Sequence, residues 1–201
     1  RHICYGAFMS QLDHIAVYCA SSDAISNTYK IQATNIGRYL AENGITVVYG
    51  GGGVGLMNCV AEGALSVGGK VIGVITEKLE SMEVGRTDLT TMHVVKTMRE
   101  RKALMAELAD GFISLPGGYG TLEELFEVTT LTQLRIQLKP VGILNIRGFY
   151  DHLLAFIEHA ADEGFIRPVH RDLICVDTDI EGLIMKMKQS RVPEFDEWLR
   201  D

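Results

Sequence analysis

Two glycine-rich segments have the composition and setting of phosphate-binding turns. The first, residues 49–58, contains four consecutive glycines, Gly50 to Gly53, followed by Gly55. It comes after an apolar run and before a stretch with helical spacing. Glycine would let the backbone approach an anion at a helix start, where N–H groups are free. A tight turn without a ligand is the alternative, but four glycines exceed what a turn needs, so we favour phosphate or nucleotide binding.

The first segment also has the G-x-G-x-x-G spacing of a dinucleotide-binding turn, through Gly50, Gly52 and Gly55. That fingerprint usually lies in the first strand–helix unit, with a ribose-binding acid about 20 residues later. Here the segment follows the second expected strand. Glu77, near the right offset, is a weak match because acids often follow strands. An NAD-dependent oxidoreductase is therefore a less favoured hypothesis, which predicts a melting-temperature shift with NAD and none with AMP.

The second segment is LPGGYGTLEEL, residues 115–125, which also leads from an apolar run through glycines into a helix. The two turns could face each other across one crevice, one holding a phosphate and the other a sugar or base. Thr121 and Glu124 have the spacing of a capping box, in which Thr caps the helix and Glu bonds back to its N–H. By spacing alone we favour capping as the role of Glu124, with Glu123 pointing towards solvent.

A basic cluster of Arg99, Arg101 and Lys102 begins a helical stretch directly after an expected strand. Charge runs are usually solvated faces, and Glu100 and Glu107 could pair with these cations. At the edge of a sheet in an acidic protein, the same cations suit a phosphorylated ligand. Residue type alone leaves these two alternatives equal.

The remaining polar residues predict little chemistry. Ser21 follows the first expected strand and could donate to a ligand or begin the next helix, and no G-x-S-x-G elbow indicates a serine hydrolase. The six His lack ligand spacing, so no metal site is predicted. The four Cys are far apart and indicate reduced thiols in a cytoplasmic protein.

These residues need a scaffold that gathers several strand ends in one place. Short apolar runs predict strands at 15–19, 46–49, 71–75, 93–95, 111–115, 141–145 and 173–176. Amphipathic stretches predict helices at about 26–43, 55–67, 97–109, 121–138, 150–163 and 179–188. This alternation predicts an α/β fold with an open, mostly parallel sheet of about seven strands, which binds ligands at the carboxyl ends of its strands. The segment 76–92 is a long loop without clear periodicity, and such loops are often functional.

Length and composition bound the protein class. The chain has 201 residues, 47% of them hydrophobic and 22% charged, which favours one folded domain. We expect that domain to span residues 9–188, with 1–8 as an appended or disordered segment and 189–201 as a tail. A net charge of −7 disfavours a broad nucleic-acid interface. No apolar window is long enough to cross a membrane, and no secretory pattern is visible.

The second glycine segment, PGGYGTLEE at 116–124, together with M-x-x-R-K at 98–102, resembles the Lonely Guy family. Members are nucleoside 5′-monophosphate phosphoribohydrolases that activate cytokinins, long labelled lysine decarboxylase-like. The resemblance runs from about Ile15 to Val176. It implies a Rossmann-like fold with helices on both faces of the sheet, a homodimer with the site near the subunit interface, and no metal or cofactor.

The resemblance implies that Arg101 and Glu124 are catalytic. Cleavage of an N-glycosidic bond passes through an oxocarbenium-like sugar cation, which an ionised Glu124 would stabilise while Arg101 anchors phosphate or ribose hydroxyls. The helix end and Arg101 are both expected to favour the ionised form. Residue types and resemblance together predict the following substrate-binding set: Ser21, Gly52, Gly53, Gly55, Met57, Glu83, Arg101, Lys102, Pro116, Gly117, Gly118, Tyr119, Gly120, Thr121, Glu123 and Thr130.

Three residues depart from the family pattern: Arg99 for a frequent His, Ala20 for a usual Gly and Thr76 for a usual Pro. None removes the catalytic pair. The substrate would be AMP or a cytokinin riboside 5′-monophosphate, and the sequence leaves the preferred base open. A non-catalytic nucleotide or molybdenum-cofactor carrier of the same fold is the alternative. Lysine decarboxylation would need a Schiff-base Lys, and Lys102 is better interpreted as a phosphate contact.

Overall fold

The computed structural model describes residues 11–82 and 85–194. In this part of the chain, strands and helices alternate as expected. The strands are β1 His14–Tyr18, β2 Thr46–Tyr49, β3 Val71–Thr76, β4 Thr91–Val95, β5 Gly111–Ser114, β6 Val141–Leu144 and β7 Ile174–Asp177. The helices are α1 Asn27–Glu42, α2 Gly55–Leu65, α3 Glu77–Met82, α4 Met98–Leu108, α5 Tyr119–Gln133, α6 Asp151–Asp162 and α7 Ile180–Gln189, with 3₁₀ turns η1 Ile146–Gly148 and η2 Pro168–His170.

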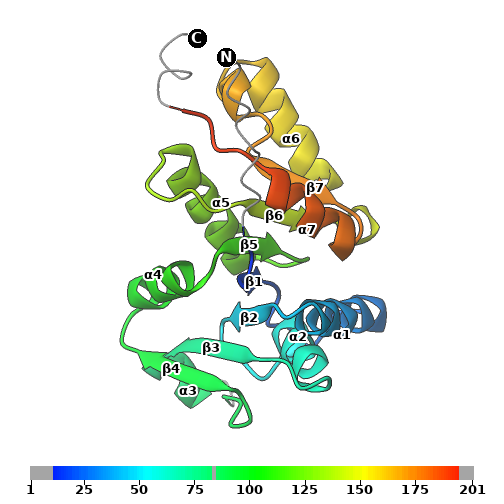
Figure 1. The fold of residues 1–201 in the computed structure, drawn as a ribbon, viewed down its shortest axis with the longest axis vertical. Helices are drawn as coiled ribbons and strands as arrows, with labels where there is room; N and C mark the ends of the chain where they lie inside the picture. Colours follow the sequence, from blue (N-terminus) through cyan, green and yellow to red (C-terminus); the bar gives the residue numbers. More distant parts are fainter. Residues whose placement is uncertain (1–10, 83–84, 195–201) are drawn as a thin grey trace, which may run out of the picture.

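The strands form one parallel sheet in the order β4-β3-β2-β1-β5-β6-β7, from bottom to top of Figure 1. The prediction of an open, parallel sheet of about seven strands is confirmed. The chain first builds outward from β1 through β2 to β4 and then returns to build outward through β5. This reversal makes the carboxyl ends of β1 and β5 the switch point, where such sheets bind ligands.

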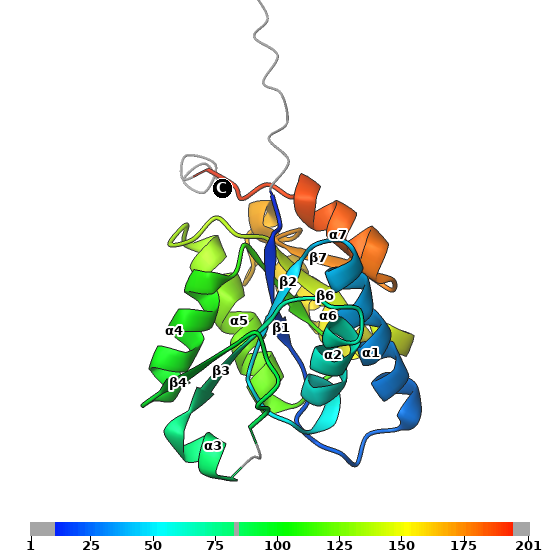
Figure 2. The same cartoon turned by 60° about the horizontal axis from the view of Figure 1, so that its bottom comes forward.

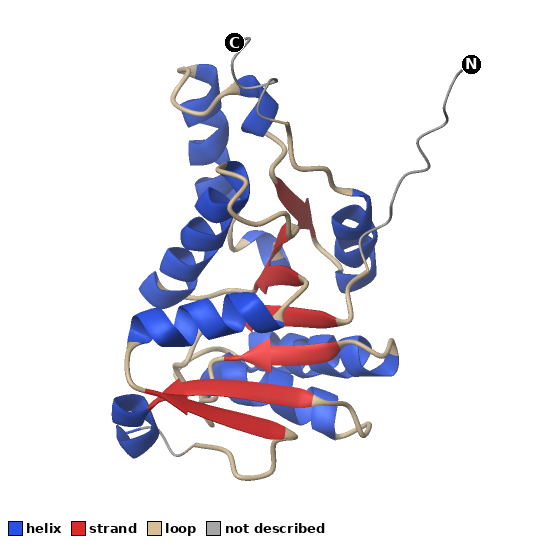
Figure 3. Ribbon diagram, turned by 60° about the vertical axis from the view of Figure 1, so that its left-hand side comes forward, coloured by secondary structure: helices blue, strands red, loops and turns tan. Residues whose placement is uncertain are grey.

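Helices cover both faces of the sheet, as Figures 2 and 3 show. One core layer contains side chains of α1, α2 and α7, and the other contains side chains of α4, α5 and α6. Successive residues of β1 alternate between the layers: Ile15 and Val17 face the first, Ala16 and Tyr18 the second. Because both faces are buried, the strands read in the sequence as continuous apolar runs.

Two predicted segments differ from the structure. The expected loop 76–92 contains the short helix α3, whose six residues make fewer than two turns and are too few to show an apolar periodicity in the sequence. The helix predicted at 121–138 begins at Tyr119 and ends at Gln133. Arg135 adopts a left-handed conformation, with a φ of 54°, which an α-helix cannot continue through. Within the described residues, no helix is long and apolar enough to cross a membrane.

Candidate active site

A cavity of about 360 Å³ lies at the carboxyl end of β1, between the loop that follows β1 and the start of α5. The elements that line it are the β1 loop, α2, α3, α4 and the second glycine segment. The lining residues are Cys19, Ala20, Ser21, Ser22, Met57, Leu79, Met98, Arg101, Gly118, Tyr119, Gly120, Thr121, Glu123 and Glu124. Parts of both predicted glycine segments therefore meet at one cavity.

Helix α4 presents Arg101 to the cavity and keeps it buried. The helix begins after Thr97, whose hydroxyl accepts the N–H of Glu100 at 3.1 Å, while the Glu100 carboxylate accepts the N–H of Lys96 at 2.9 Å. These paired bonds stabilise the helix start. Arg101 is 7% exposed and Arg99 is exposed, so the predicted basic cluster divides into one buried and one solvated arginine.

The Arg101 guanidinium binds Glu124 directly. Its Nη1 donates to Glu124 Oε1 at 3.0 Å, and its Nε donates to the backbone carbonyl of Val74 in β3 at 2.9 Å. Glu124 is 8% exposed. The structure thus brings together the two residues that the sequence analysis expected to be catalytic, in a buried, charge-assisted pair.

The capping interpretation of Glu124 is wrong. Helix α5 starts at Tyr119, with Gly118 at the N-cap and no side-chain cap. Thr121 and Glu124 therefore lie inside the helix rather than at its boundary, and Glu124 turns inward to Arg101. The error arose because the helix begins two residues earlier than its apolar spacing indicates.

Burial raises the pKa of Glu124 above its ordinary value, although the adjacent Arg101 lowers it. Glu123 also raises this pKa and Lys102 lowers it, both more weakly. The net direction is opposite to the expected one, because the expected stabilisation of the anion did not include the desolvation of the carboxylate. Glu124 is therefore closer to its protonated form near neutral pH than an exposed glutamate would be.

Lys102 is engaged by two carboxylates of α5. Its Nζ pairs with Glu123 Oε1 and, at 3.0 Å, with Glu127 Oε2. The hydrogen bond to Glu123 raises the pKa of Lys102, so the ammonium form is favoured. The sequence analysis expected Glu123 to point towards solvent. Its side chain is 55% exposed, but its carboxylate pairs with Lys102. Any contact of Lys102 or Glu123 with a substrate stays a prediction.

The N-terminus of α5 faces the cavity. Gly118, Tyr119 and Gly120 are exposed there, and Tyr119 is 95% exposed. The first N–H groups of a helix have no intrahelical partner, and among the residues that the structure describes no side chain caps those of α5. Such an end attracts phosphate or carboxylate groups.

The start of α2 differs from the start of α5, because its first N–H groups already donate hydrogen bonds within the protein. Gly55 donates to Asp23 Oδ1 at 3.0 Å, and Leu56 donates to the carbonyl of Ala20 at 2.9 Å. A Cβ at Gly55 would lie 2.6–2.8 Å from the backbone of the β1 loop. The prediction of a free helix start is therefore wrong here, and Gly55 lets α2 pack closely on the β1 loop.

Several predicted binding residues lie away from this cavity. Gly52 forms an isolated antiparallel bridge with Gly85, and neither Gly52, Gly53 nor Gly55 lines the cavity. Pro116 and Gly117 line an adjoining apolar cavity of about 370 Å³. Whether these residues contact substrate stays a prediction. Glu83 lies outside the described residues.

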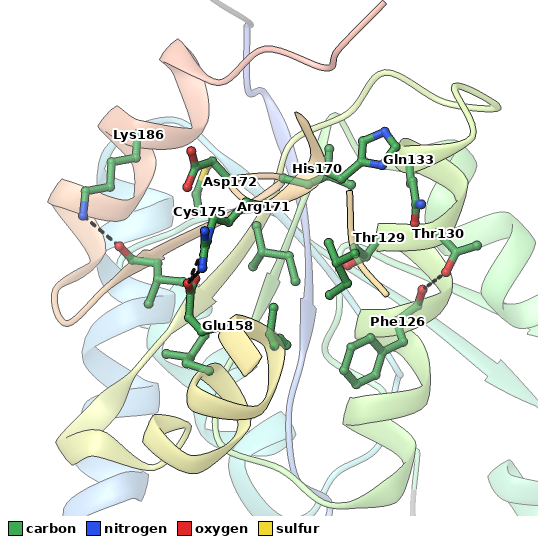
Figure 4. Close-up of a pocket in the computed structure, with 16 residues that line it drawn as sticks. Phe126, Thr129, Thr130, Gln133, Glu158, His170, Arg171, Asp172, Cys175 and Lys186 are labelled. Atoms are coloured by element: carbon green, nitrogen blue, oxygen red, sulfur yellow. Dashed lines mark hydrogen bonds and ion pairs between the residues drawn. The ribbon is translucent and has the colours of Figure 1, made fainter. Parts of the chain in front are cut away.

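Thr130 lies two and a half turns beyond Thr121 on α5, roughly 13 Å along the helix axis. It lines a separate cavity of about 450 Å³ between α5, α6 and β7, drawn in Figure 4. Its hydroxyl donates to the carbonyl of Phe126 at 2.7 Å. One chain alone therefore does not bring Thr130 to the cavity that holds Arg101 and Glu124.

The sequence analysis missed part of the apolar wall, which includes Leu79 and Met98. Leu79 gave no signal because α3 itself was not predicted. Met98 could have been found, since it is the first residue of the helix that carries Arg101. Together with Met57, these side chains give the cavity an apolar part of its lining.

Comparison with known proteins establishes the family. A family model described as "Possible lysine decarboxylase" matches residues 57–187. The chain is 46% identical over 175 residues to the cytokinin riboside 5′-monophosphate phosphoribohydrolase of Rhodococcoides fascians, covering 87% of this chain and 88% of that protein. It is 45% identical over 188 residues to cytokinin riboside 5′-monophosphate phosphoribohydrolase LOG7 of Arabidopsis thaliana, covering 94% and 86%. The chain belongs to the Lonely Guy family.

Membership makes this Lonely Guy chain a hydrolase of the N-glycosidase type. Solved structures show the same fold in more distant proteins. The molybdenum cofactor binding protein of the phototrophic bacterium Rippkaea orientalis superimposes with a TM-score of 0.67 at 20% identity, covering 89% of this chain and 96% of that one. At that identity, the likeness supports a common fold and carries no argument about ligands.

Proposed function

We propose that this enzyme hydrolyses the N-glycosidic bond of a nucleoside 5′-monophosphate, AMP or a cytokinin riboside 5′-monophosphate, to the free base and ribose 5-phosphate. The observation that carries the proposal is the buried Arg101–Glu124 pair in a cavity that is also lined by the start of α5, where the N-cap residue Gly118 offers no side-chain cap. The names of the relatives support the same substrate class.

The proposed mechanism follows from the charges around the cavity. The N-terminus of α5 binds the phosphate, and the apolar side formed by Met57, Leu79 and Met98 receives the base. The C1′–N bond breaks, a C1′–O bond to water forms, and one proton of that water goes to the departing base. The ionised Glu124 stabilises the developing cation at C1′ or orients the water, while Arg101 holds Glu124 and contacts a ribose hydroxyl.

Lys102 supports hydrolysis over decarboxylation. A Schiff base needs a neutral amine, but the ion pairs of Lys102 with Glu123 and Glu127 favour its protonated form. In the proposed mechanism, Lys102 orders α4 against α5.

The test is release of free base from AMP and from isopentenyladenosine 5′-monophosphate, followed by chromatography. One positioned charge is worth about 10²–10³ in rate, so Glu124→Gln and Arg101→Ala should each lose at least that factor while keeping a cooperative melting transition. Glu127→Gln is the matched control, because Glu127 lies one turn further along α5 and does not line the cavity.

Each other outcome has a clear meaning. Wild-type rates in Glu124→Gln would refute the mechanism. Tight nucleotide binding without base release would favour the carrier alternative. The ratio of kcat/KM for the prenylated and plain nucleotides then identifies the preferred base.

A further inference from the structure

Gly50 lies where β2 leaves the sheet, next to the Arg101 guanidinium. Pairing of β2 with β3 ends at Tyr49 and Gly73, whereas β3 continues to pair with β4 as far as Thr76. The carbonyl of Val74 is thus one residue past the β2 ladder, and it accepts the Nε proton of Arg101 at 2.9 Å. The guanidinium occupies the place that a longer β2 would take.

The space at Gly50 is filled by the arginine itself. A Cβ at this position would lie 2.0 Å from Arg101 Nη2 and 3.2 Å from Arg101 Cζ. Gly50 does not have the positive φ that would disfavour other residues, unlike its neighbour Gly51 at +77°. Glycine is therefore required at position 50 by what lies against it: the nearest atoms to that Cβ belong to Arg101 and to the more flexible tip of Met57, 3.0 Å away.

Arg101 has little freedom to give way. Its side chain is 8% exposed, and it is held by Val74 through Nε and by Glu124 through Nη1. A methyl group at position 50 would push Nη2 away and tilt the guanidinium, because the three nitrogens are coplanar. The tilt would act on the bond to Glu124.

We propose that Gly50 is a positioning residue, whose missing side chain forms the seat of the Arg101 guanidinium and thereby fixes the orientation of Glu124. At position 50, the missing side chain of the first glycine segment makes room for the Arg101 guanidinium and not for a phosphate. The inference rests on the proposed roles of Arg101 and Glu124. It adds the residue that directly follows β2 to the parts of the fold that set the catalytic geometry.

The experiment is a double-mutant cycle of Gly50→Ala with Arg101→Ala, read out by melting temperature and by kcat and KM for AMP. Misplacement of a catalytic group by about 1 Å can cost about 10² in rate, so Gly50→Ala alone should lower kcat by about that factor. It should also lower the melting temperature in the wild-type background. In the Arg101→Ala background the methyl group enters vacated space, so Gly50→Ala should leave the melting temperature unchanged.

The melting-temperature cycle separates the outcomes. An equal loss of melting temperature in both backgrounds, or failure of both Gly50→Ala proteins to fold, would show that Gly50 serves the turn itself and would overturn the proposal. Wild-type kcat and melting temperature in Gly50→Ala would also overturn it. A Gly50→Ala protein that folds only with Arg101→Ala supports it. If the wild type releases no base, the proposed function fails. The melting temperatures of the double-mutant cycle still test whether Gly50 makes room for the Arg101 guanidinium.

Discussion

Glu124 experiences two opposing effects that set its protonation. Desolvation raises its pKa, and the Arg101 guanidinium 3.0 Å away lowers it, with desolvation the larger effect. In the proposed mechanism, the same burial strengthens the electrostatic action of the carboxylate on a developing sugar cation, because less water screens it. Burial therefore strengthens the interaction of the Glu124 carboxylate with a nearby cation, but it also narrows the pH range in which Glu124 is ionised.

The pH profile should reveal this balance. The proposed mechanism needs ionised Glu124, so kcat/KM should rise as pH increases through the pKa of Glu124 in the free enzyme. Because that pKa is raised from 4.5, the midpoint of the acidic limb should lie above 4.5. A profile of kcat/KM for AMP checks this. A limb centred at or below 4.5 would contradict the assignment.

Lys102 should move the same limb. Its positive charge lowers the pKa of Glu124, and it also screens the negative charge of Glu123, so Lys102→Met should shift the acidic midpoint of kcat/KM to higher pH. Lys96→Met removes an exposed cation just before α4 and should leave the midpoint in place. An unchanged midpoint in Lys102→Met would mean that the lysine has no electrostatic influence on Glu124.

The two glycine turns are different elements despite their similar sequences. The start of α5 has no side-chain cap and faces the cavity, whereas the start of α2 is bonded to the β1 loop through Asp23 and Ala20. Asp23 acts as a cap supplied from a distant segment, since its carboxylate accepts the N–H of Gly55. This bond ties the cavity-lining β1 loop to α2.

Asp23→Ala should lower the free energy of unfolding by about 1 kcal/mol, the usual value of a lost N-cap. Asp23→Asn keeps an acceptor oxygen and should lose less. Urea denaturation of the two variants and the wild type measures the difference. Equal losses for Ala and Asn would indicate that the charge pair with Lys30, at 3.6 Å, is the relevant interaction.

Helices α1 and α2 pack closely through glycines. A Cβ at Gly63 would lie 1.9 Å from the carbonyl oxygen of Thr34, so the helices cannot keep their separation with any larger residue. Glycine to alanine in a helix interior normally stabilises by about 1 kcal/mol. Overpacking a close contact costs about 1–3 kcal/mol.

Gly63→Ala should therefore be destabilising, against the normal helix preference. Asn35→Ala, at an exposed position of α1, should be neutral or stabilising and serves as its control. Chemical denaturation of both variants provides the comparison. Stabilisation by Gly63→Ala would show that the two helices separate easily.

At the scale of the whole molecule, several apolar side chains along α5 and its exit remain exposed. They are Tyr119, Phe126, Leu134, Ile136 and Leu138. Contiguous exposed apolar groups often mark a protein–protein interface. We propose that the exposed apolar residues Leu134, Ile136 and Leu138 at the exit of α5 belong to the interface of the homodimer expected from the family resemblance.

Light scattering during size-exclusion chromatography should give a mass of about 44 kDa, twice the 22.2 kDa of one chain. Ile136→Asp combined with Leu138→Asp should reduce it to the mass of one chain. Ile31→Asp, at another exposed isoleucine, on α1, should leave the dimer intact. A wild-type mass of one chain would contradict the proposal.

The sequence by itself determined the α/β class, all seven described strands and the identity of Arg101 and Glu124, the two charged residues that pair in the cavity. Strands buried on both faces must be apolar throughout, and helices must alternate with them, so local composition reports both. Helix α3 could not be predicted in the same way, since its six residues make fewer than two turns, too few for an apolar period to show.

The tertiary structure alone decided what those residues do. The spacing of Thr121 and Glu124 is compatible with a cap, and only the position of α4 shows that Glu124 faces Arg101, 23 residues away in the chain. The role of Gly50 likewise depends on a guanidinium that reaches it from another element. Sequence patterns report contacts within one element, because their period follows from the geometry of that element. Contacts between elements depend on the order of strands in the sheet, which no local pattern contains.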